Sequence, residues 1–533
     1  MSSNAGGSAS SVGVAGEPPS RSAGGGKPAV KSKVSASASA INASKFGYDQ
    51  ARHLLWRAGF GGTPEQIQTL ASWGPQKAVD YLIEYEKVPF VDSDSTRFDG
   101  SIMRPLTPDE RAALQRARRS NDTEAVARYE AERQKRQMSD RKQVRDVQHW
   151  WMKRMIETPR PLEEKLTLLW HGHFATSYRT IEDSYHMYRQ NEFFRKNASG
   201  SFGDLLFGII RDPAMIAYLD NNDSSKNRPN ENLARELMEL FSLGVGNYTE
   251  KDIKEGARAL TGYTFEDDEF VFQKNNHDDG GKAILGRRGN LDGDGFVSAI
   301  LEQRACASFV ARKLYRFFAA DYPTGRPEID AAAEGMIRGL ASTLLRNKYQ
   351  LRPALRELFL SEHFYDPALA AEQIKSPVQL VVGAVRSLGA PPRDLSVLLD
   401  AMNLMGQNLL FPPSVKGWDG GRAWINTATL FVRQNILAYL LTGKTPTGYD
   451  AMAGSEKYDP MKLLTPLDAA DPTARRDPAK VADFLTRFAL GRPSPESREP
   501  LLAFLASHSN TLTPDVLTGL LLLITTMPEY QLC

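Results

Sequence analysis

The stretch PLEEKLTLLWHGHF, residues 161–174, predicts a helix, and its pattern recurs in the neighbouring segments of the chain. Pro161 stands near the start, where a missing backbone N–H costs nothing, and Glu163 and Glu164 lie in the first turn, where carboxylates are favoured. Further segments with apolar residues at helical spacing come in close succession up to Tyr263. The stretch and its neighbours therefore indicate a protein built from packed helices.

Strand-like alternation is scarce along the chain. The clearest run is FVFQ, residues 270–273, and AILG, residues 283–286, is expected to add a second short strand. Helical patterns resume after it, from LEQRACASFV through SPVQLVVG. We therefore expect a mainly α fold: a large multi-helix domain with at most a few short strands.

The composition divides the chain into four regions. Residues 1–45 are rich in Ser, Ala and Gly and are expected to be a disordered tail. Residues 46–445 form the main helical domain, with a charged helical insertion near 107–145 that begins at the helix-capping sequence Thr-Pro-Asp-Glu. Residues 446–480 are expected to be a polar linker, and residues 481–533 a helical pair that packs on the main domain.

The charge balance and the apolar segments limit which classes of partner we expect. The 66 basic and 64 acidic residues give a net charge of +2, so we expect no nucleic-acid partner. The most apolar late stretch, residues 516–527, is shorter than the roughly 20 residues that span a bilayer, so we expect a buried helix and no membrane span. Cys306 and Cys533 are not expected to form a disulfide. No signal peptide is visible, which favours a cytoplasmic location for the chain as written.

Two histidines, His171 and His173, are separated by one residue at the end of the helix predicted over residues 161–174. On a continuing helix their side chains would point about 200° apart, and one metal ion could not bind both. Gly172 can end the helix, and both imidazoles could then face one cavity. The alternative is a pair of imidazoles satisfied by backbone carbonyls at the helix C-terminus.

A second group of polar residues lies in RPNENLARELMELFSLG, residues 228–244. Asn232, Arg235, Glu236 and Glu239 fall on one face of a helix that Asn230 can cap. One interpretation is an ordinary amphipathic helix with a solvent face. The other is an internal polar cluster, which often marks a functional site because buried carboxylates are costly.

A third candidate is the glycine-rich loop NNHDDGGKAILG, residues 275–286. His277 and Asp278 could supply a ligand or a general base, and Lys282 could bind an anion. The alternative is a turn in which Asp and Gly only serve backbone geometry.

Taken in order, these segments resemble a bacterial family known as domain of unknown function 1800. The resemblance runs from about Lys45 to the C-terminus and is carried by segments that include ARHLLWRAGFGGTP, PLEEKLTLLWHGHFATS, PNENLARELMELFSLG, HDDGGKAILG, KSPVQLVVGAVRSLG and PPSVKGWDGGRAWIN. It implies a mostly helical fold, but the activity of the family is unsettled. Many members look exported, and their genes often lie beside those of sulfatase- or phosphatase-like proteins. The resemblance therefore implies export as the alternative location and a sulfatase-like protein as a partner.

The resemblance also groups the three polar motifs. It matches Trp170, His171, His173 and Phe174, then the Asn-Glu-Asn-x-Ala-Arg-Glu-Leu motif from Asn230 to Leu237, then His277, Asp278 and Lys282. The simplest physical account is that these motifs meet in one cavity.

Our first hypothesis is a metal-dependent hydrolase that acts on a glycan or an ester-modified polymer. A divalent metal, zinc or similar, would be held by His171, His173 and Glu236. The catalytic residues would be Glu239, His277 and Asp278. A polysaccharide or an anionic small molecule would be bound by Asn230, Asn232, Arg235, Lys282 and Trp418, with the indole stacked on a sugar face.

Two alternatives stay open. The first is a metal-free hydrolase, in which Glu236 works with Glu239 or Asp278 as a carboxylate pair. The second is a non-enzymatic binding or assembly protein that partners an exported hydrolase, with the polar residues forming a buried hydrogen-bonded network.

Overall fold

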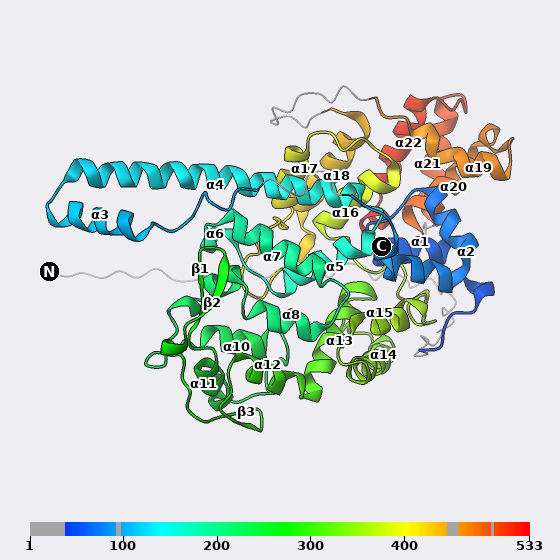
Figure 1. Ribbon diagram of the computed structural model, residues 1–533. Helices are drawn as coiled ribbons and strands as arrows, with labels where there is room; N and C mark the ends of the chain where they lie inside the picture. The colour runs from blue at the N-terminus through cyan, green and yellow to red at the C-terminus, as the bar shows by residue number, and fades with distance from the viewer. Residues whose placement is uncertain (1–37, 92–97, 445–456, 492–494) are drawn as a thin grey trace, which may run out of the picture. The chain divides into compact units, whose positions relative to one another are not determined.

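The computed structural model describes residues 38–91, 98–444, 457–491 and 495–533, and within them the fold is mainly α, as predicted (Figure 1). The strands form two separate antiparallel pairs. β1 (Tyr263–Glu266) pairs with β2 (Glu269–Phe272), and β3 (Lys282–Ile284) pairs with β4 (Arg287–Gly289). The two runs expected to be strands, FVFQ and AILG, contribute to β2 and β3.

The remaining secondary structure of the main domain is helical. The helices are α1 (Tyr48–Arg57), α2 (Pro64–Ile83), α3 (Pro108–Arg119), α4 (Thr123–Glu157), α5 (Pro161–His173), α6 (Tyr178–Ile181), α7 (Ser184–Lys196), α8 (Phe202–Ile209), α9 (Pro213–Tyr218), α10 (Asn232–Glu239), α11 (Glu250–Ala259), α12 (Gly293–Leu301), α13 (Arg304–Phe318), α14 (Pro327–Arg346), α15 (Leu351–Leu360), α16 (Pro377–Leu388), α17 (Leu395–Leu404) and α18 (Thr427–Thr442). Among the described helices, none combines the length and the apolar character needed to cross a membrane.

Helix α5 lies at the centre of this arrangement. All of its residues except Gly172 are buried, the charged ones included. It packs against α7 and also contacts α2 and α4, as Figure 1 shows. A helix that is covered on every side must satisfy its polar side chains inside the protein.

Glu164 is the most completely buried carboxylate of α5, with no exposed surface. Its oxygens accept hydrogen bonds from the Trp151 indole nitrogen at 3.0 Å, from Arg154, and from two nitrogens of Arg195 at 2.7 and 3.1 Å. Burial raises the pKa of Glu164, but the charges of Arg195 and Arg154 outweigh it and hold this pKa below its usual value. This network ties α5 to α4 and α7.

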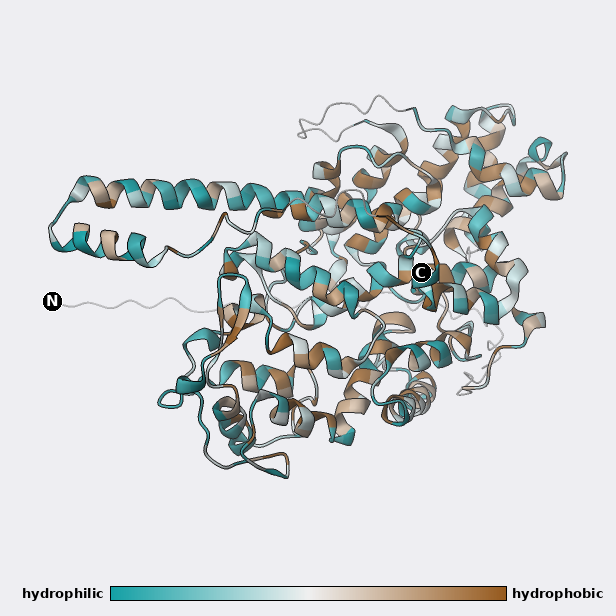
Figure 2. Cartoon of the chain, viewed as in Figure 1, coloured by the Kyte–Doolittle hydropathy of each residue, from teal (hydrophilic) through white to brown (hydrophobic). Residues whose placement is uncertain are grey.

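The charged insertion contains a helical hairpin formed by α3 and the first part of α4. Thr107 and Glu110 form a capping box at the start of α3, which packs along the N-terminal part of α4. Figure 2 shows these two helices as mostly hydrophilic where they pair. The end of α4, in contrast, buries Trp150 and Trp151, because the same helix continues from the insertion into the core.

The boundary expected for the N-terminal tail is displaced. Residues 1–37 lie outside the described residues, but residues 38–45 contact the main domain. The backbone N–H of Ile41 donates to the Leu360 carbonyl at 2.7 Å, and the Ile41 side chain is buried. One apolar side chain in an otherwise small and polar stretch is enough to hold these residues at the surface of the core.

The C-terminal part is more helical than expected. Part of the predicted linker lies outside the described residues, but residues 457–480 include α19 (Thr465–Ala470) and the start of α20 (Pro478–Leu490). The expected helical pair is in fact three helices, since α21 (Arg498–Ser507) and α22 (Pro514–Thr526) come after α20. α22 packs on α18 of the main domain. Short helices with polar surfaces, such as α19, resemble a linker in composition alone.

We expect Glu164→Gln to destabilise the protein by about 3–5 kcal/mol, because two buried guanidiniums would lose their shared carboxylate. Urea unfolding measures the loss. The matched control is Glu163→Gln, whose carboxylate lies farther from its arginines, at 3.3 Å from Arg154 and 3.8 Å from Arg160. Equal losses for the two variants would contradict a central role for Glu164.

Candidate functional site

The histidine pair lies on a helix that does not end at Gly172. α5 continues through His173, so the prediction that Gly172 ends the helix is wrong. The two imidazoles point to different neighbours: His171 Nε2 accepts the Leu410 N–H at 3.2 Å, and His173 Nε2 donates to the Phe241 carbonyl at 2.9 Å. Burial lowers the pKa of His171 to about 3 and that of His173 well below its usual value, so both rings are neutral.

The metal set expected from the sequence is not gathered by the structure. Within the described ranges, the one group of three or more ligating side chains whose ligand atoms lie within 4.8 Å of one another is Asp183, His186 and Asp268. His171, His173 and Glu236 do not form such a group. A zinc ion shared by those three residues would need a rearrangement of α5, because i and i+2 side chains diverge on a helix.

The polar face of α10 lies towards the surface rather than inside the core. Arg235 forms a bidentate salt bridge with Glu250 at 2.9 and 3.0 Å, and Asn232 is exposed. Glu239 accepts a hydrogen bond from the Tyr248 hydroxyl. Glu236 is half-buried, and burial together with the charge of Glu239 raises its pKa.

The start of α10 is held by the predicted residue. Asn230 Oδ1 accepts the Asn232 N–H at 2.9 Å, and its amide donates to the Asp220 carbonyl at 2.8 Å. Asn230 thus bonds the first residue of α10 from one position before the N-cap, which is Glu231 and makes no side-chain capping hydrogen bond. Its binding of substrate stays a prediction.

The side chains of the His-Asp loop are engaged within the loop and with α11. His277 Nδ1 donates to the Thr261 carbonyl at 2.8 Å. Asp278 pairs with Arg258 at 2.7 and 3.1 Å, and these hydrogen bonds lower the pKa of Asp278 to about 2. Lys282 donates to the carbonyls of Asp278 and Gly280. This is the geometry expected of the turn alternative.

The three motifs lie side by side in a chain of contacts instead of lining one cavity. His173 contacts Phe241 just after α10, α10 packs on α11, and α11 holds the loop through Arg258. Of the predicted site residues, His173 and Trp418 do line a common cavity, which lies beside α5. We take this cavity as the candidate site.

The cavity has a volume of about 300 Å3 and is formed at the C-terminal end of α5, the end of α13, the segment before α16 and the loop around Trp418. Its lining includes Lys165, Gly172, His173, Lys313, Arg316, Phe317, Asp321, Gln373, Gln379, Gln407, Lys416, Trp418, Asp419 and Trp424. Such a mixture of aromatic faces, amides and charges is typical of a small-molecule site.

The Trp418 loop is placed by two glycines. Gly417 has a φ of +81°, and a Cβ atom there would lie only 2.1 Å from the Gly172 carbonyl oxygen. Gly172 in turn lies under the Trp418 ring, which also contacts the His171 ring at 5.6 Å between centroids. The close approach of the loop to α5 therefore depends on Gly417, whereas a Cβ atom at Gly172 would be in ordinary contact with the Trp418 ring.

The charged residues of the cavity are mostly basic. Lys165 is 3% exposed and lies over the rings of Phe60 and Phe317, 5.1 and 5.4 Å from their centroids. Burial lowers the pKa of Lys165 to about 7. Burial and the nearby charges of Arg316 and Lys416 lower the pKa of Lys313 to about 8.

Three lysines line the cavity, and two of them have no carboxylate partner within the described residues. Within the described part of the chain, Lys165 and Lys313 form no hydrogen bond or salt bridge, whereas Lys416 pairs with Asp419 at 2.7 Å. The amides, by contrast, are fixed: Gln379 donates to the Trp56 carbonyl at 2.8 Å. The cavity can therefore offer uncompensated positive charge to a ligand.

Lys165, Lys313 and Asp321 were missed by the sequence reasoning. A signal existed for Lys165, because the five residues that follow it, LTLLW, are mainly apolar and the helix carrying it is predicted to be internal. Lys313 and Asp321 resemble ordinary surface residues of an amphipathic helix and the loop after it, and only the fold brings them to α5.

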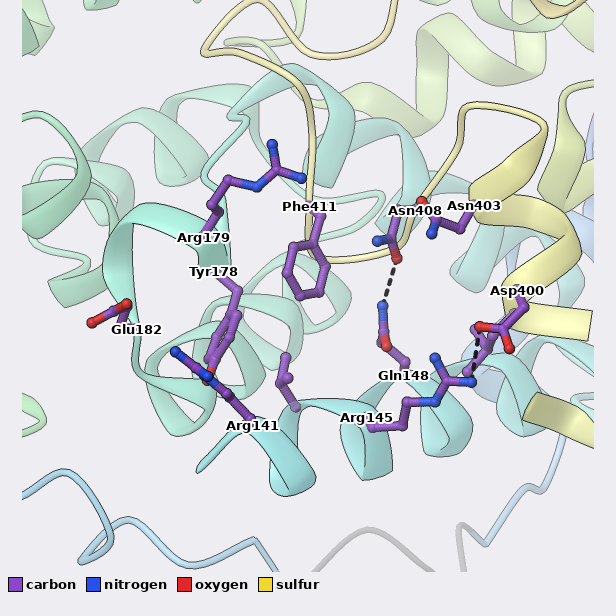
Figure 3. Close-up of a pocket in the computed structure, with 12 residues that line it drawn as sticks. Arg141, Arg145, Gln148, Tyr178, Arg179, Glu182, Asp400, Asn403, Asn408 and Phe411 are labelled. Atoms are coloured by element: carbon purple, nitrogen blue, oxygen red, sulfur yellow. Dashed lines mark hydrogen bonds and ion pairs between the residues drawn. The ribbon is translucent and has the colours of Figure 1, made fainter. Parts of the chain in front are cut away.

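A second pocket, of about 360 Å3, lies between α4, α6 and α17 (Figure 3). Arg145 in it pairs with Asp400 at 2.9 Å, and Gln148 donates to Asn408 and Leu409. The Tyr178 hydroxyl donates a hydrogen bond to the buried Asp140 carboxylate at 2.7 Å. This pocket is larger, but it holds no predicted site residue and no buried lysine, so we give it less weight than the α5 cavity.

The Asp183–His186–Asp268 group joins α7 to the turn between β1 and β2. Asp183 caps α7, and His186 Nε2 lies 3.1 Å from Asp268 Oδ1 and 3.0 Å from the Asp267 carbonyl. Burial lowers the pKa of His186, but its contacts with Asp268 and Asp183 outweigh this and raise it overall. These residues could hold a divalent cation, or the imidazolium itself could join the two carboxylates.

Comparison with known proteins gives one result. A family model described as protein of unknown function (DUF1800) matches residues 53–532. No curated protein and no solved structure matches the chain.

Substitution of the two glycines tests how the loop is placed. Gly417→Ala should destabilise the protein by about 2 kcal/mol or more, because of the positive φ and the close carbonyl of Gly172. Gly172→Ala should change stability by less than about 1 kcal/mol, since its Cβ atom would meet Trp418 at an ordinary 3.5 Å. Chemical unfolding of both variants measures this, and a larger loss for Gly172→Ala would refute the packing described.

The raised pKa of His186 predicts a pH-dependent contribution to stability. A raised folded-state pKa gives stability that is complete below the unfolded pKa of about 6.5 and is lost as the pH rises through the folded pKa. His186→Gln should therefore destabilise the protein more at about pH 5.5 than at about pH 9. A loss that is independent of pH would show that His186 contributes by packing alone.

Proposed function

We propose that this chain, which belongs to the DUF1800 family of proteins of unknown function, binds an anionic, hydroxyl-rich ligand in the cavity at the end of α5. An acidic sugar unit of a polysaccharide has this chemistry. The observation that carries the proposal is the pair of cavity cations on α13, Lys313 and Arg316, which form no salt bridge with a carboxylate within the described residues. A ligand carboxylate, phosphate or sulfate would supply the missing negative charge.

The positions of the cations support an anchoring function. Lys313 and Arg316 lie three residues apart on α13, so they share one face of that helix, and both line the cavity. Arg316 is exposed and Lys313 is partly buried. A charge that is partly shielded from water attracts an anion more strongly than one on an open surface.

The aromatic residues of the cavity support recognition of a sugar ring. Trp418 is partly exposed, and its indole packs against Gly172 and His171 of α5, which restrict its orientation. Trp424 lines the same cavity and is buried. A fixed indole offers a flat apolar face with little loss of entropy on binding, which suits the C–H face of a sugar.

Hydrolysis of a glycan is a second candidate, in its metal-free form. Two carboxylates line the cavity, Asp321 and Asp419, and hydrolysis of a glycosidic bond commonly uses such a pair. Asp321 forms no hydrogen bond or salt bridge within the part of the chain described. The carboxylates expected from the sequence, Glu236 and Glu239, do not line this cavity, and the metal-dependent form finds no ligand set there.

Calorimetric titration with glucuronate tests the binding proposal, with glucose as the uncharged comparison. We expect glucuronate to bind and its affinity to fall with rising salt, because the attraction is electrostatic. Lys313→Met and Trp418→Ala should each weaken glucuronate binding about tenfold, or about 1.4 kcal/mol.

The matched control is Lys142→Met, the same substitution at an exposed lysine of α4 outside the cavity lining. It should leave glucuronate binding unchanged. Equal binding of glucose and glucuronate, or equal effects of the two lysine variants, would contradict the proposed site.

A further inference from the structure

Three buried lysines of this protein differ in what their amines contact. Lys375 is fully buried and donates to the Tyr530 carbonyl at 2.6 Å, with the rings of Trp56 and Tyr530 about it. Lys282 donates to two loop carbonyls. Lys165 lies over the aromatic rings of Phe60 and Phe317 and forms no hydrogen bond or salt bridge with the residues that the structure describes, and it alone of the three lines the α5 cavity.

This difference separates structural lysines from a reactive one. An amine whose nitrogen donates to backbone carbonyls, as in Lys375 and Lys282, is already engaged and lines no part of the cavity. Lys165 has lost most of its hydration to burial without gaining an oxygen acceptor in the described residues, and this shifts its equilibrium towards the uncharged amine. The Lys165 amine therefore faces the cavity with a lone pair that nothing in the described residues occupies.

We propose that Lys165 is the nucleophile of the cavity and forms an imine with the carbonyl group of a small anionic substrate, a 2-oxo acid or the open-chain form of an acidic sugar. The proposal rests on the proposed function, because the same cavity must admit the anion. Desolvation in an apolar pocket beside other cations is a known way to activate a lysine for this chemistry.

The step balances without any further reagent. The Nζ lone pair attacks the carbonyl carbon, the C=O π pair moves to oxygen, and a proton passes from nitrogen to oxygen to give a carbinolamine. The hydroxyl then leaves with one proton as water, and the C=N bond forms. Hydrolysis reverses the sequence and releases Lys165 unchanged.

Other residues of the cavity suit the parts of such a substrate. Lys313 and Arg316 can hold its carboxylate. Asp321 can relay the proton that moves from the nitrogen to the oxygen as the carbinolamine forms and breaks down. The volume of about 300 Å3 admits a small substrate and not a large one.

Reductive trapping with glyoxylate, a small aldehyde acid, tests the proposal on the full chain. Borohydride converts an imine at lysine into a stable carboxymethyl amine, which peptide mass mapping locates. At about pH 7 an exposed lysine is almost wholly protonated, so Lys165 should be trapped at least about tenfold faster than Lys142. Lys375, whose amine is occupied, should stay unmodified.

Two controls keep the result interpretable. Lys165→Met must lose the adduct at that position while circular dichroism shows that it folds, and Lys165→Arg replaces it if the methionine variant does not fold. Excess glucuronate should slow the trapping at Lys165 and leave that at Lys142 unchanged.

The possible failures are distinguishable. If glyoxylate is trapped only at exposed lysines in a protein that still binds glucuronate, the proposal that Lys165 is a nucleophile is wrong. The proposed binding site would then still stand. Trapping at Lys165 without glucuronate binding or protection would instead overturn the acidic-sugar ligand, while the amine would remain supported.

Discussion

The buried carboxylate of Glu164 is the interaction on which the rest of the structure depends. It has no exposed surface, and it is shared by Arg154 of α4 and Arg195 of α7. A buried charge is tolerated only when its partners are close and its hydrogen bonds are complete, and both conditions hold here. The network therefore fixes α5 between two other helices and determines where its C-terminal end lies.

The residue after Glu164 has the opposite environment. Successive side chains on a helix point about 100° apart, so Lys165 turns away from the arginines and towards Phe60, Phe317 and the cavity. Glu164 pairs with two arginines and accepts a further hydrogen bond from the Trp151 indole, whereas Lys165 forms no salt bridge within the described residues. The first contributes to the fold, and the second, which burial makes less basic, is the one suited to chemistry.

The sequence predicted the mainly α fold class, and the functions it assigned to the site residues stay predictions. Helical periodicity, capping residues and scarce strand patterns led to a mainly α fold, because these are local properties. The C-terminal helices and residues 38–45 were misjudged because their order comes from contacts with the core, such as that of Ile41 with Leu360. Trp418 and His173 line the cavity, whereas α5 continues through Gly172, and Gly417 is the glycine that the close packing of the loop requires. Lys313 and Asp321 could not be found, since their approach to α5 depends on long-range packing.

The central claim is that the cavity at the end of α5 is a binding site for an anionic, hydroxyl-rich ligand that reaches Lys165. A crystal structure of the full chain grown with glucuronate tests it most directly. We predict a sugar ring against Trp418, its carboxylate at Lys313 and Arg316, and one of its oxygens within reach of Lys165. An empty cavity at a saturating concentration, or glucuronate bound at the arginines between α4 and α6 instead, would contradict the claim.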